Sequence, residues 1–304
     1  MRIIYADSNY FTIYHCGTKA FQTTYDSLEH ILLHAQVHDY FLLPEYHFIF
    51  TSKSYVFYSQ EPFSLKDFKK LLQDYVLDQK KQFPHINQLL HQDTHDIKID
   101  NQTSNFLLGH KGQIRFQLDC IFGSNTSEID FSLLTDKKVA LLPCSYGALK
   151  QCNTLLNDND YSILYINNNQ SKLIQVKNQF YSSIHSINFG KETLKLMYQE
   201  HNLLKYYRDP NSTTPVTESI VKDVAGFFAE KLVDRFSSIV APHTNMIIIS
   251  DITKNTYCME ALKKLYSQFI NGYILPMSLP NSDPGLPLDI TATLQLINKK
   301  TIER

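Results

Sequence analysis

The sequence predicts an α/β protein with two domains of modest size. Its 304 residues exceed what one small hydrophobic core needs, which favours two domains over one. A hairpin followed by a helix occurs in both halves of the chain, first near the N-terminus and more clearly over Tyr161–Gly190. Hydrophobic residues make up 43% and charged residues 19% of the chain, proportions that are typical of folded proteins and argue against disorder.

The composition of the chain argues against nucleic-acid binding, membrane-surface binding and a metal site. The 29 Lys and Arg residues nearly balance the 30 Asp and Glu residues, so net charge gives no reason to expect nucleic-acid or membrane-surface binding. No signal-peptide pattern and no apolar stretch of about 18 residues is present, and no C-x-x-C pair occurs, which together predict a cytoplasmic chain with free thiols. No metal site is expected, because His30, His34 and His38 share a predicted helix face without further ligands nearby.

Apolar alternation and turn residues mark the elements of the first half. Strands are predicted between turn residues, and helices where apolar residues recur three and four apart. The expected elements are a hairpin of strands Arg2–Ala6 and Phe11–Cys16, a helix Ser27–Val37, a strand Tyr46–Ser59, a helix beginning at Ser64, a hairpin of strands Phe106–Leu108 and Ile114–Phe122, a strand Lys138–Leu142 and a helix Ser145–Leu155. The most polar tract, Gln79–His95, is expected to be a surface loop or a short helix.

The second half opens with the most informative stretch of the chain. Tyr161–Gly190 is predicted to run strand, polar turn, strand, turn, strand, with a helix beginning after Gly190. The expected elements that follow are a helix Glu192–Leu204, an amphipathic helix Thr217–Ile239 capped by Thr217, a strand Met246–Ser250, a helix Met259–Phe269 and a helical segment Ile290–Ile297.

Several segments carry a resemblance to a known family. ADSNYFTIYH and LYINNNQSKLIQV are similar to two phosphate-binding hairpins, IIISDITKN to an adenosine-side turn, and FIFTSKSYVFYSQEPFSLKDFKKLLQDY to a small inserted subdomain. In this order they resemble the actin-like ATPase superfamily, and more narrowly its FtsA/PilM branch in bacteria. The resemblance implies a ribonuclease H-like duplicated fold with a first half at 1–40 and 126–156, an inserted α+β subdomain at 41–125, a second half at 157–280 and a closing helix at 281–304 that returns to the first half.

The phosphate-binding positions depart from the family pattern. In the first loop the family's Asp-x-Gly retains Asp7 but has Asn9 in place of glycine. In the second loop, Tyr165 stands at the metal-side carboxylate, Asn167 at the glycine and Ser171 at the threonine. A bulky phenol at the carboxylate position would stand where Mg²⁺ or its waters sit. Asp7 could be a residual metal-binding or water-positioning carboxylate, but a turn residue that stabilises its own hairpin is the favoured interpretation.

The third loop has lost its glycines as well, and Ser250 and Asp251 stand in their place. Changes at all of these loops predict a catalytically inactive pseudo-ATPase without a cofactor; ATP and Mg²⁺ would bind only if the chain were an active relative. Asn167, Asn168 and Asn169 could donate side-chain amides to a ligand. A structural turn explains them too, because asparagine tolerates left-handed backbone geometry.

The resemblance also implies a role. The chain ends at Arg304 soon after the closing helix, without the membrane-binding tail of the division proteins. This favours a PilM-like scaffold of a type IV pilus or related secretion assembly, peripheral to the inner membrane through a partner. The alternatives are an FtsA-like cell-division filament protein that self-associates, and an active ATPase of the actin and sugar-kinase superfamily.

The expected partner is a short cytoplasmic peptide of an inner-membrane protein. The family places such a peptide in a groove between the inserted subdomain and the first half. There an extended peptide can add backbone hydrogen bonds to a strand edge while its apolar side chains fill pockets. Phe57, Phe63, Phe68 and Tyr75 are the candidate residues of the groove, although aromatic residues at such spacing are more often core.

Overall fold

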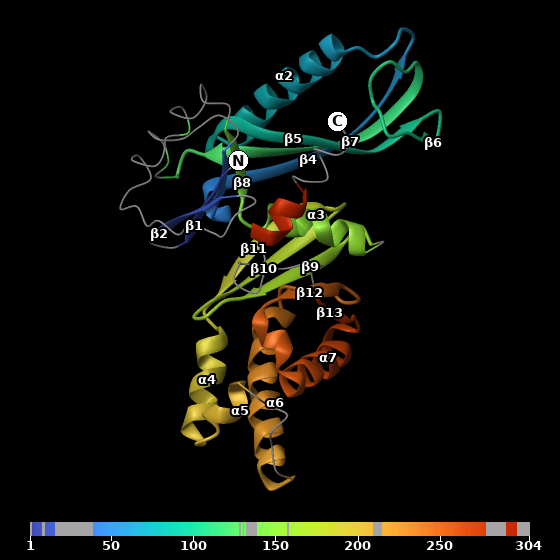
Figure 1. Cartoon of the computed structure of the whole chain (residues 1–304). Coiled ribbons are helices and arrows are strands. Elements are labelled where there is room, and N and C mark those ends of the chain that lie inside the picture. Colours follow the sequence, from blue (N-terminus) through green and yellow to red (C-terminus); the bar gives the residue numbers. More distant parts are fainter. Residues whose placement is uncertain are drawn as a thin grey trace. The chain divides into compact units, whose positions relative to one another are not determined.

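The computed structural model describes residues 2–7, 10–15, 39–127, 129, 131, 139–156, 158–208, 215–277 and 290–296 (Figure 1). The chain divides into two compact units, a first unit of Met1–Gly147 with Pro284–Arg304 and a second unit of Ala148–Asp283. The first half was predicted to end at residue 156, just after helix α3 (Tyr146–Leu155). The division between the two units falls instead near the start of this helix, between Gly147 and Ala148. The predicted helix at 27–37, and with it the three histidines, lies outside the described residues.

The first unit contains a four-stranded sheet that begins with the predicted N-terminal hairpin. Strands β1 (Arg2–Asp7) and β2 (Tyr10–His15) are antiparallel, and β3 (Tyr40–Leu43) and β8 (Ala140–Pro143) continue the sheet parallel to β1. The strand order is therefore β2-β1-β3-β8. The middle strands bury Ile3, Ile4, Phe41 and Leu42 almost completely, as continuous apolar runs in a parallel sheet do.

The second unit repeats this plan. Strands β9 (Tyr161–Ile166), β10 (Ser171–Lys177) and β11 (Phe180–Ile187) form an antiparallel meander, and β12 (Asn245–Ile249) and β13 (Ile274–Pro276) extend the sheet parallel to β9. The order is β11-β10-β9-β12-β13. In both sheets the first strand has its hairpin on one side and parallel strands on the other. The predicted fold class is therefore confirmed as a duplicated, actin-like α/β fold.

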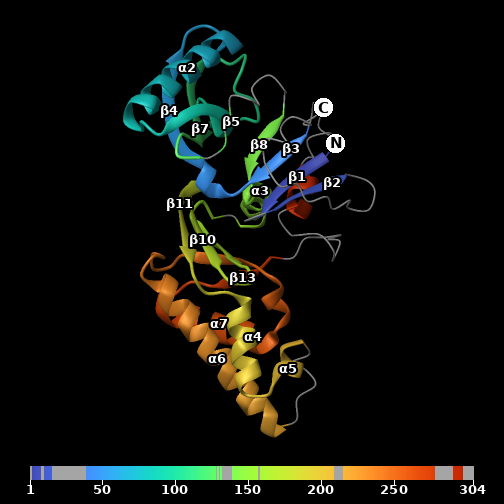
Figure 2. The same cartoon turned by 90° about the vertical axis from the view of Figure 1, so that its left-hand side faces the viewer.

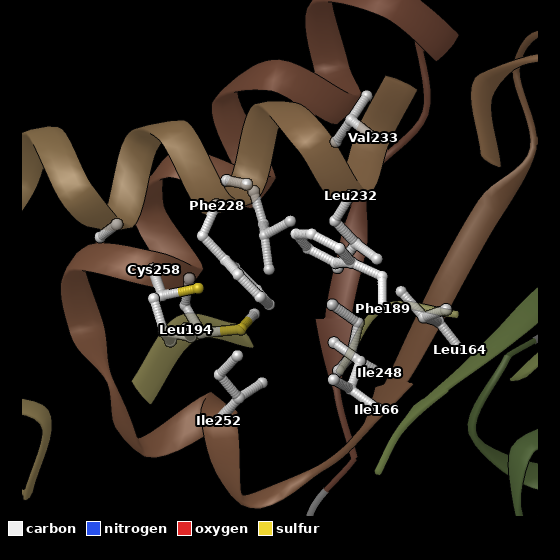
Figure 3. Packing of buried hydrophobic residues seen from close by; sticks show 14 of the residues in the cluster. Leu164, Ile166, Phe189, Leu194, Phe228, Leu232, Val233, Ile248, Ile252 and Cys258 are labelled. Carbon is white, nitrogen blue, oxygen red and sulfur yellow. The ribbon is translucent and has the colours of Figure 1, made fainter. Parts of the chain in front are cut away.

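Helices cover one face of the second sheet (Figures 1 and 2). They are α4 (Lys191–Glu200), α5 (Leu204–Arg208), α6 (Pro215–Ser237) and α7 (Thr256–Ile270), with a 3-10 turn η4 (Asp251–Lys254) before α7. Figure 3 shows side chains from helices and strands converging, among them Leu164, Phe228 and Ile248. The rings of Phe189 and Phe228 stack with centroids 4.9 Å apart. This core joins the end of the β-meander to the helices.

Two helix predictions in the second unit need correction. Helix α6 begins at Pro215, so Thr217 lies in its first turn and is not the N-cap. Proline suits the first helical position because its fixed φ is helical and its missing N–H has no helical partner there. The helix expected at 192–204 ends at Glu200, because Asn202 lies in the left-handed region at φ 57°, and a separate helix, α5, begins at Leu204.

The inserted subdomain of the first unit is a four-stranded antiparallel sheet covered on one face by a helix (Figure 2). After a 3-10 turn η1 (Glu45–His47) come β4 (Phe48–Ser59), α2 (Leu65–Gln82), β5 (Ile86–Ile99), β6 (Gln102–Thr103) and β7 (Gly112–Ser124), in the order β4-β7-β5-β6. The predicted start of α2 is confirmed, because Ser64 and Asp67 form a reciprocal capping box.

The polar tract at 79–95 was predicted to be a surface loop or a short helix, and this prediction is wrong. Its first residues, up to Gln82, finish α2; a short turn follows, and the tract from Ile86 onward belongs to β5, which pairs along β7. Polar side chains are tolerated there because His95 Nε2 hydrogen-bonds Asp119 at 2.7 Å and His91 Nε2 hydrogen-bonds the Tyr146 hydroxyl at 2.8 Å. Tertiary hydrogen bonds of this kind leave no trace in local periodicity.

The hairpin expected at 106–122 is also wrong in its first strand. Residues 106–108 form a loop, and β7 pairs instead with β4 and β5. Two backbone hydrogen bonds hold the loop to the start of α2: Gly109 N–H donates to Phe63 O, and Phe63 N–H donates to His110 O, both at 2.8 Å. Gly109 permits the turn because its φ is 85°. No helix in the described part of the chain is both long enough and apolar enough to cross a membrane.

Candidate functional site

The turn between β9 and β10 stands where the resemblance places the second phosphate loop. Ile166 pairs with Ser171, and the Asn167 N–H donates to the Gln170 carbonyl at 3.0 Å. This geometry is that of a structural turn, and it does not use the left-handed backbone that asparagine tolerates. None of Asn167, Asn168 and Asn169, all of them described, has a positive φ. The turn therefore needs no glycine.

The carbonyl groups of this turn occupy the N-terminus of helix α4. The Lys191 N–H donates to Asn167 O and the Glu192 N–H to Asn168 O, both at 2.8 Å. The first N–H groups of a helix otherwise lack partners and form a natural site for an anion. Here the protein's own backbone satisfies them, so a phosphate group would have to displace two hydrogen bonds.

Gly190 makes this contact possible. A Cβ atom at this position would lie 2.5 Å from the carbonyl oxygen of Asn167, far inside van der Waals contact. The φ of Gly190 is −147°, which any residue adopts, so glycine is required for space and not for conformation. The close approach of turn and helix is therefore built into the sequence at one residue.

The serines at the other loop positions also bond to the chain itself. The Ser171 hydroxyl donates to Phe189 O at 2.5 Å, and Ser171 is fully buried. The Ser250 hydroxyl donates to Ile166 O at 2.8 Å and accepts from the Ile252 N–H at 3.3 Å. Ser250 thus joins the ends of β9 and β12 in addition to capping η4.

Tyr165, which the resemblance places at the metal-side carboxylate position, is only 6% exposed. It lies on β9, opposite Lys172 of β10 and Ile249 of β12. Asp251 begins η4 directly after Ser250. Across the described residues, no group of three or more His, Cys, Asp or Glu side chains is arranged to hold a metal ion.

In the first unit, Asp7 is the last residue of β1 and pairs with Tyr10 across the N-terminal hairpin. Asn9 lies outside the described residues. The first-loop position therefore belongs to one unit, and the second-loop and third-loop positions belong to the other.

A groove of about 370 Å³ lies between β4 and α2 in the inserted subdomain. Phe57, Phe63 and Tyr75 of the predicted aromatic set line it, and the structure brings them together. Phe68 does not line it; this residue is half-buried against the hydrophobic core under α2. Residues that the sequence-based prediction missed complete the lining: Lys53, Tyr55, Asp67, Lys70, Leu71, Asp74 and Asp78.

Aromatic rings form the floor and one end of the groove. Tyr55 stacks on Phe116 of β7 at 5.3 Å between centroids and meets Tyr75 edge-on at 6.4 Å. Phe57 packs against Phe63 at 5.1 Å. Burial raises the pKa of Tyr75 to about 12, so its hydroxyl stays protonated at neutral pH. The floor is therefore an uncharged aromatic surface.

Charged residues form the rim. On α2, Asp67, Lys70, Asp74 and Asp78 recur at helical spacing along one face, which is the sequence signal that could have revealed them. The Lys53 Nζ lies 5.1 Å from the centre of the Tyr55 ring. The pKa of Tyr55 is raised, first by burial and then by neighbours that include the α2 carboxylates.

Comparison with known proteins gives structural neighbours only. No protein-family model matches the sequence, and no curated protein matches it. Among solved structures, a chain of the PilM–PilN type IV pilus biogenesis complex is similar over 90% of this chain and 87% of its own length, at 9% identity and a TM-score of 0.37. A Bacteroides thetaiotaomicron protein with an actin-like ATPase fold and unknown function covers 97% and 95%, at 9% identity and a TM-score of 0.39.

A third neighbour, the pSK41 ParM protein in its apo form, covers 55% of this chain and 52% of its own length, at 12% identity and a TM-score of 0.38. Because these scores are low, the fold assignment rests on the strand order of the two sheets.

Proposed function

We propose that this chain is a nucleotide-independent scaffold that binds a short, extended cytoplasmic peptide of an inner-membrane partner. The groove between β4 and α2 is its binding site. The protein acts by holding that partner, and it hydrolyses no ATP.

One observation carries the first part of the proposal. The polar groups at the phosphate-loop positions of the second unit bond to the chain itself, through the Ser171 hydroxyl, the Ser250 hydroxyl and the first N–H groups of α4. An anion that binds here must first break these hydrogen bonds, so its net binding free energy is reduced by their cost. Since a buried polar group left without a partner costs about 1–3 kcal/mol, several such losses offset much of what a phosphate could gain.

The groove supports the second part. It combines an apolar aromatic floor with a polar rim, which is the usual composition of a binding pocket. The sequence resemblance implied a peptide site between the inserted subdomain and the first half. We assign the peptide instead to the inserted subdomain itself, because the described groove lies there. A role in a type IV pilus or related secretion assembly follows from the sequence resemblance.

Isothermal titration of the whole chain with Mg-ATP, up to millimolar ligand, tests the inactive cleft. We expect no binding heat and no phosphate release, and the Asp7→Ala variant should behave identically. Micromolar binding that Asp7→Ala abolishes would contradict the proposal. That result would favour an active ATPase or a nucleotide-switched, FtsA-like filament protein.

A peptide array tests the partner class. The purified chain is applied to the cytoplasmic segments of single-span membrane proteins from the same genome, with scrambled segments of equal composition as controls. We expect a small set of native segments to bind while their scrambled forms do not. Binding that follows composition alone, or no binding at all, would contradict a peptide scaffold.

A further inference from the structure

Strand β4 presents an open backbone edge beside the groove. It has 12 residues and pairs with β7 along its whole length. Its other edge carries no strand within the described part of the chain. An edge strand of this length has a row of N–H and C=O groups ready to pair, and proteins usually shorten, twist or cover such an edge.

The two faces of β4 differ, and both are apolar near its C-terminal end. Tyr55 and Phe57 point to the α2 side, where they line the groove. On the opposite face, the side chain of Val56 is 53% exposed and that of Tyr58 is 72% exposed. Because side chains alternate along a strand, a guest strand beside β4 would present every second residue to the groove. The strand edge and the groove are therefore parts of one binding surface.

The charge of the groove rim favours a peptide strand with cationic side chains. Three aspartates and two lysines line the groove, which leaves an excess of one negative charge. Asp67 is engaged in the capping box, where hydrogen bonds from the Ser64 side chain and backbone lower its pKa. Asp74 and Asp78 are exposed on α2, and their charges act on Tyr55 across the groove. Asp78 also forms an exposed ion pair with Lys81, whose Nζ lies 3.9 Å from its Oδ1, and exposed pairs of this kind are weak enough for a guest to replace. A cationic side chain on the groove side of the guest would meet these two carboxylates.

We propose that the open edge of β4 takes an extended, basic and apolar peptide that pairs with this strand, places alternate apolar side chains in the groove and sets a Lys or Arg against Asp74 and Asp78. This inference rests on the proposed scaffold function and specifies the chemistry of its partner. It also suits a membrane partner, because cytoplasmic segments next to a transmembrane helix are enriched in Lys and Arg.

A second copy of the chain fits the edge less well. Antiparallel pairing of two β4 strands about a two-fold axis would place both α2 helices on the same face of the joined sheet. The Asp74 and Asp78 rows of the two copies would then face each other, and opposed like charges weaken an interface. A peptide that brings cations to the same place removes this repulsion.

Fluorescence anisotropy of the whole chain with designed probes tests the charge preference. The Lys probe is a labelled peptide of about ten residues in which Ile alternates with Thr and Lys replaces two of the Ile residues; the Glu probe carries Glu at those two places. We expect the Lys probe to bind about tenfold more tightly, since it matches the charge of the rim. The D74K/D78K variant should reverse this order. The matched variant D223K/E230K, with the same charge change on exposed positions of α6, should not.

N-methylation of the Lys probe tests the strand pairing without altering the protein. The N–H groups of an edge-bound strand point alternately toward and away from its host. Methylation at every second residue should therefore abolish binding in one register and leave it nearly unchanged in the other. Equal binding of both methylated probes, or equal binding of the Lys and Glu probes, would overturn the inference.

Other outcomes separate this inference from the proposed function. If array peptides bind the D74K/D78K variant unchanged, the scaffold function stands and the groove assignment falls. If the chain sediments as a dimer at micromolar concentration and no probe binds, the edge belongs to a second copy and the inference is overturned. Mg-ATP binding would contradict the inactive cleft while leaving the probe results intact.

Discussion

The turn at 167–170 and the groove between β4 and α2 are opposite kinds of surface in one chain. At the turn, backbone and hydroxyl groups are paired with each other, and the contact with α4 is so close that it requires Gly190. In the groove, aromatic side chains meet around a space of about 370 Å³ that the chain does not fill. The polar groups of the turn are thus engaged by the chain itself, whereas the inserted subdomain leaves an unfilled groove.

The difference is one of free energy. A ligand at the turn must break hydrogen bonds that already exist, whereas a ligand in the groove removes apolar surface from water at about 25 cal/mol per Å². A degenerate motif is therefore best judged by whether its remaining polar groups are engaged, and not by the identity of the lost residues alone. Substitutions in the two regions should separate stability from binding.

The largest effect is expected from Gly190→Ala. The added methyl group would collide with the carbonyl groups of Asn167 and Asn168, so we expect the free energy of unfolding to fall by about 3 kcal/mol. Urea denaturation measures this. Gly226→Ala is the matched control, because nothing lies within 4 Å of the added atom in helix α6 and the change should stabilise by about 0.5–1 kcal/mol. Equal effects of both variants would show that the turn does not pack against α4.

Alkaline pH should destabilise the protein through Tyr75. Burial raises its pKa from 10.0 to about 12, so the unfolded chain loses this proton first and stability falls as the pH rises from about 10 to 12. The full loss is on the order of 2–3 kcal/mol, because a shift of one pKa unit corresponds to about 1.4 kcal/mol. Denaturation across this range, compared with Tyr75→Phe, measures the contribution. The variant should lose less stability than the parent over the same interval, and parallel curves would refute the assignment.

The buried serine hydroxyls should contribute less. Ser171→Ala leaves the Phe189 carbonyl without its partner in a fully buried place, which should cost about 1–2 kcal/mol. Ser237→Ala, which removes a solvent-exposed hydrogen bond to Asp234 O, should change stability by less than about 0.5 kcal/mol. Thermal denaturation distinguishes the two. If they match, the Ser171 hydroxyl does not close the turn.

The smallest change in stability is expected in the groove. Phe57 is half-buried, so Phe57→Ala should cost only about 1 kcal/mol while it removes most of the affinity for the Lys probe. Val56→Ala, on the opposite face of the same strand, should change both quantities less. Anisotropy and urea denaturation on the same samples give both values. A Phe57→Ala variant that binds the probe like the parent would place the site elsewhere.

Local signals predicted the elements that depend on local chemistry. Ser64 and Asp67 identify the start of α2 because a capping box uses residues three apart. The apolar run of β9 identifies a strand buried on both faces. The two related sheets follow from the order of such segments along the chain, which is why the fold class could be recognised without any invariant residue.

The features that sequence reasoning missed depend on contacts between distant segments. Strand β5 is polar because His91 and His95 find partners on α3 and β7, more than 20 residues away. Three of the four candidate aromatic residues line the groove. Lys53 and Asp74 line it too, but they lie far apart in the sequence and become neighbours only because β4 and α2 pack together. The need for Gly190 likewise arises from Asn167 and Asn168, which lie more than 20 residues earlier in the chain.

The polar face of the inserted sheet fixes how β4 lies on β7. Asp119 accepts a hydrogen bond from Ser52 at 2.5 Å, and Gln117 accepts one from Ser54 at 2.5 Å. A slip of one residue would turn both serines toward the apolar core, so the alignment of the two strands is specified unambiguously. The position of β4 on the sheet is therefore fixed, and so are the positions of the N–H and C=O groups that its open edge offers to a guest strand.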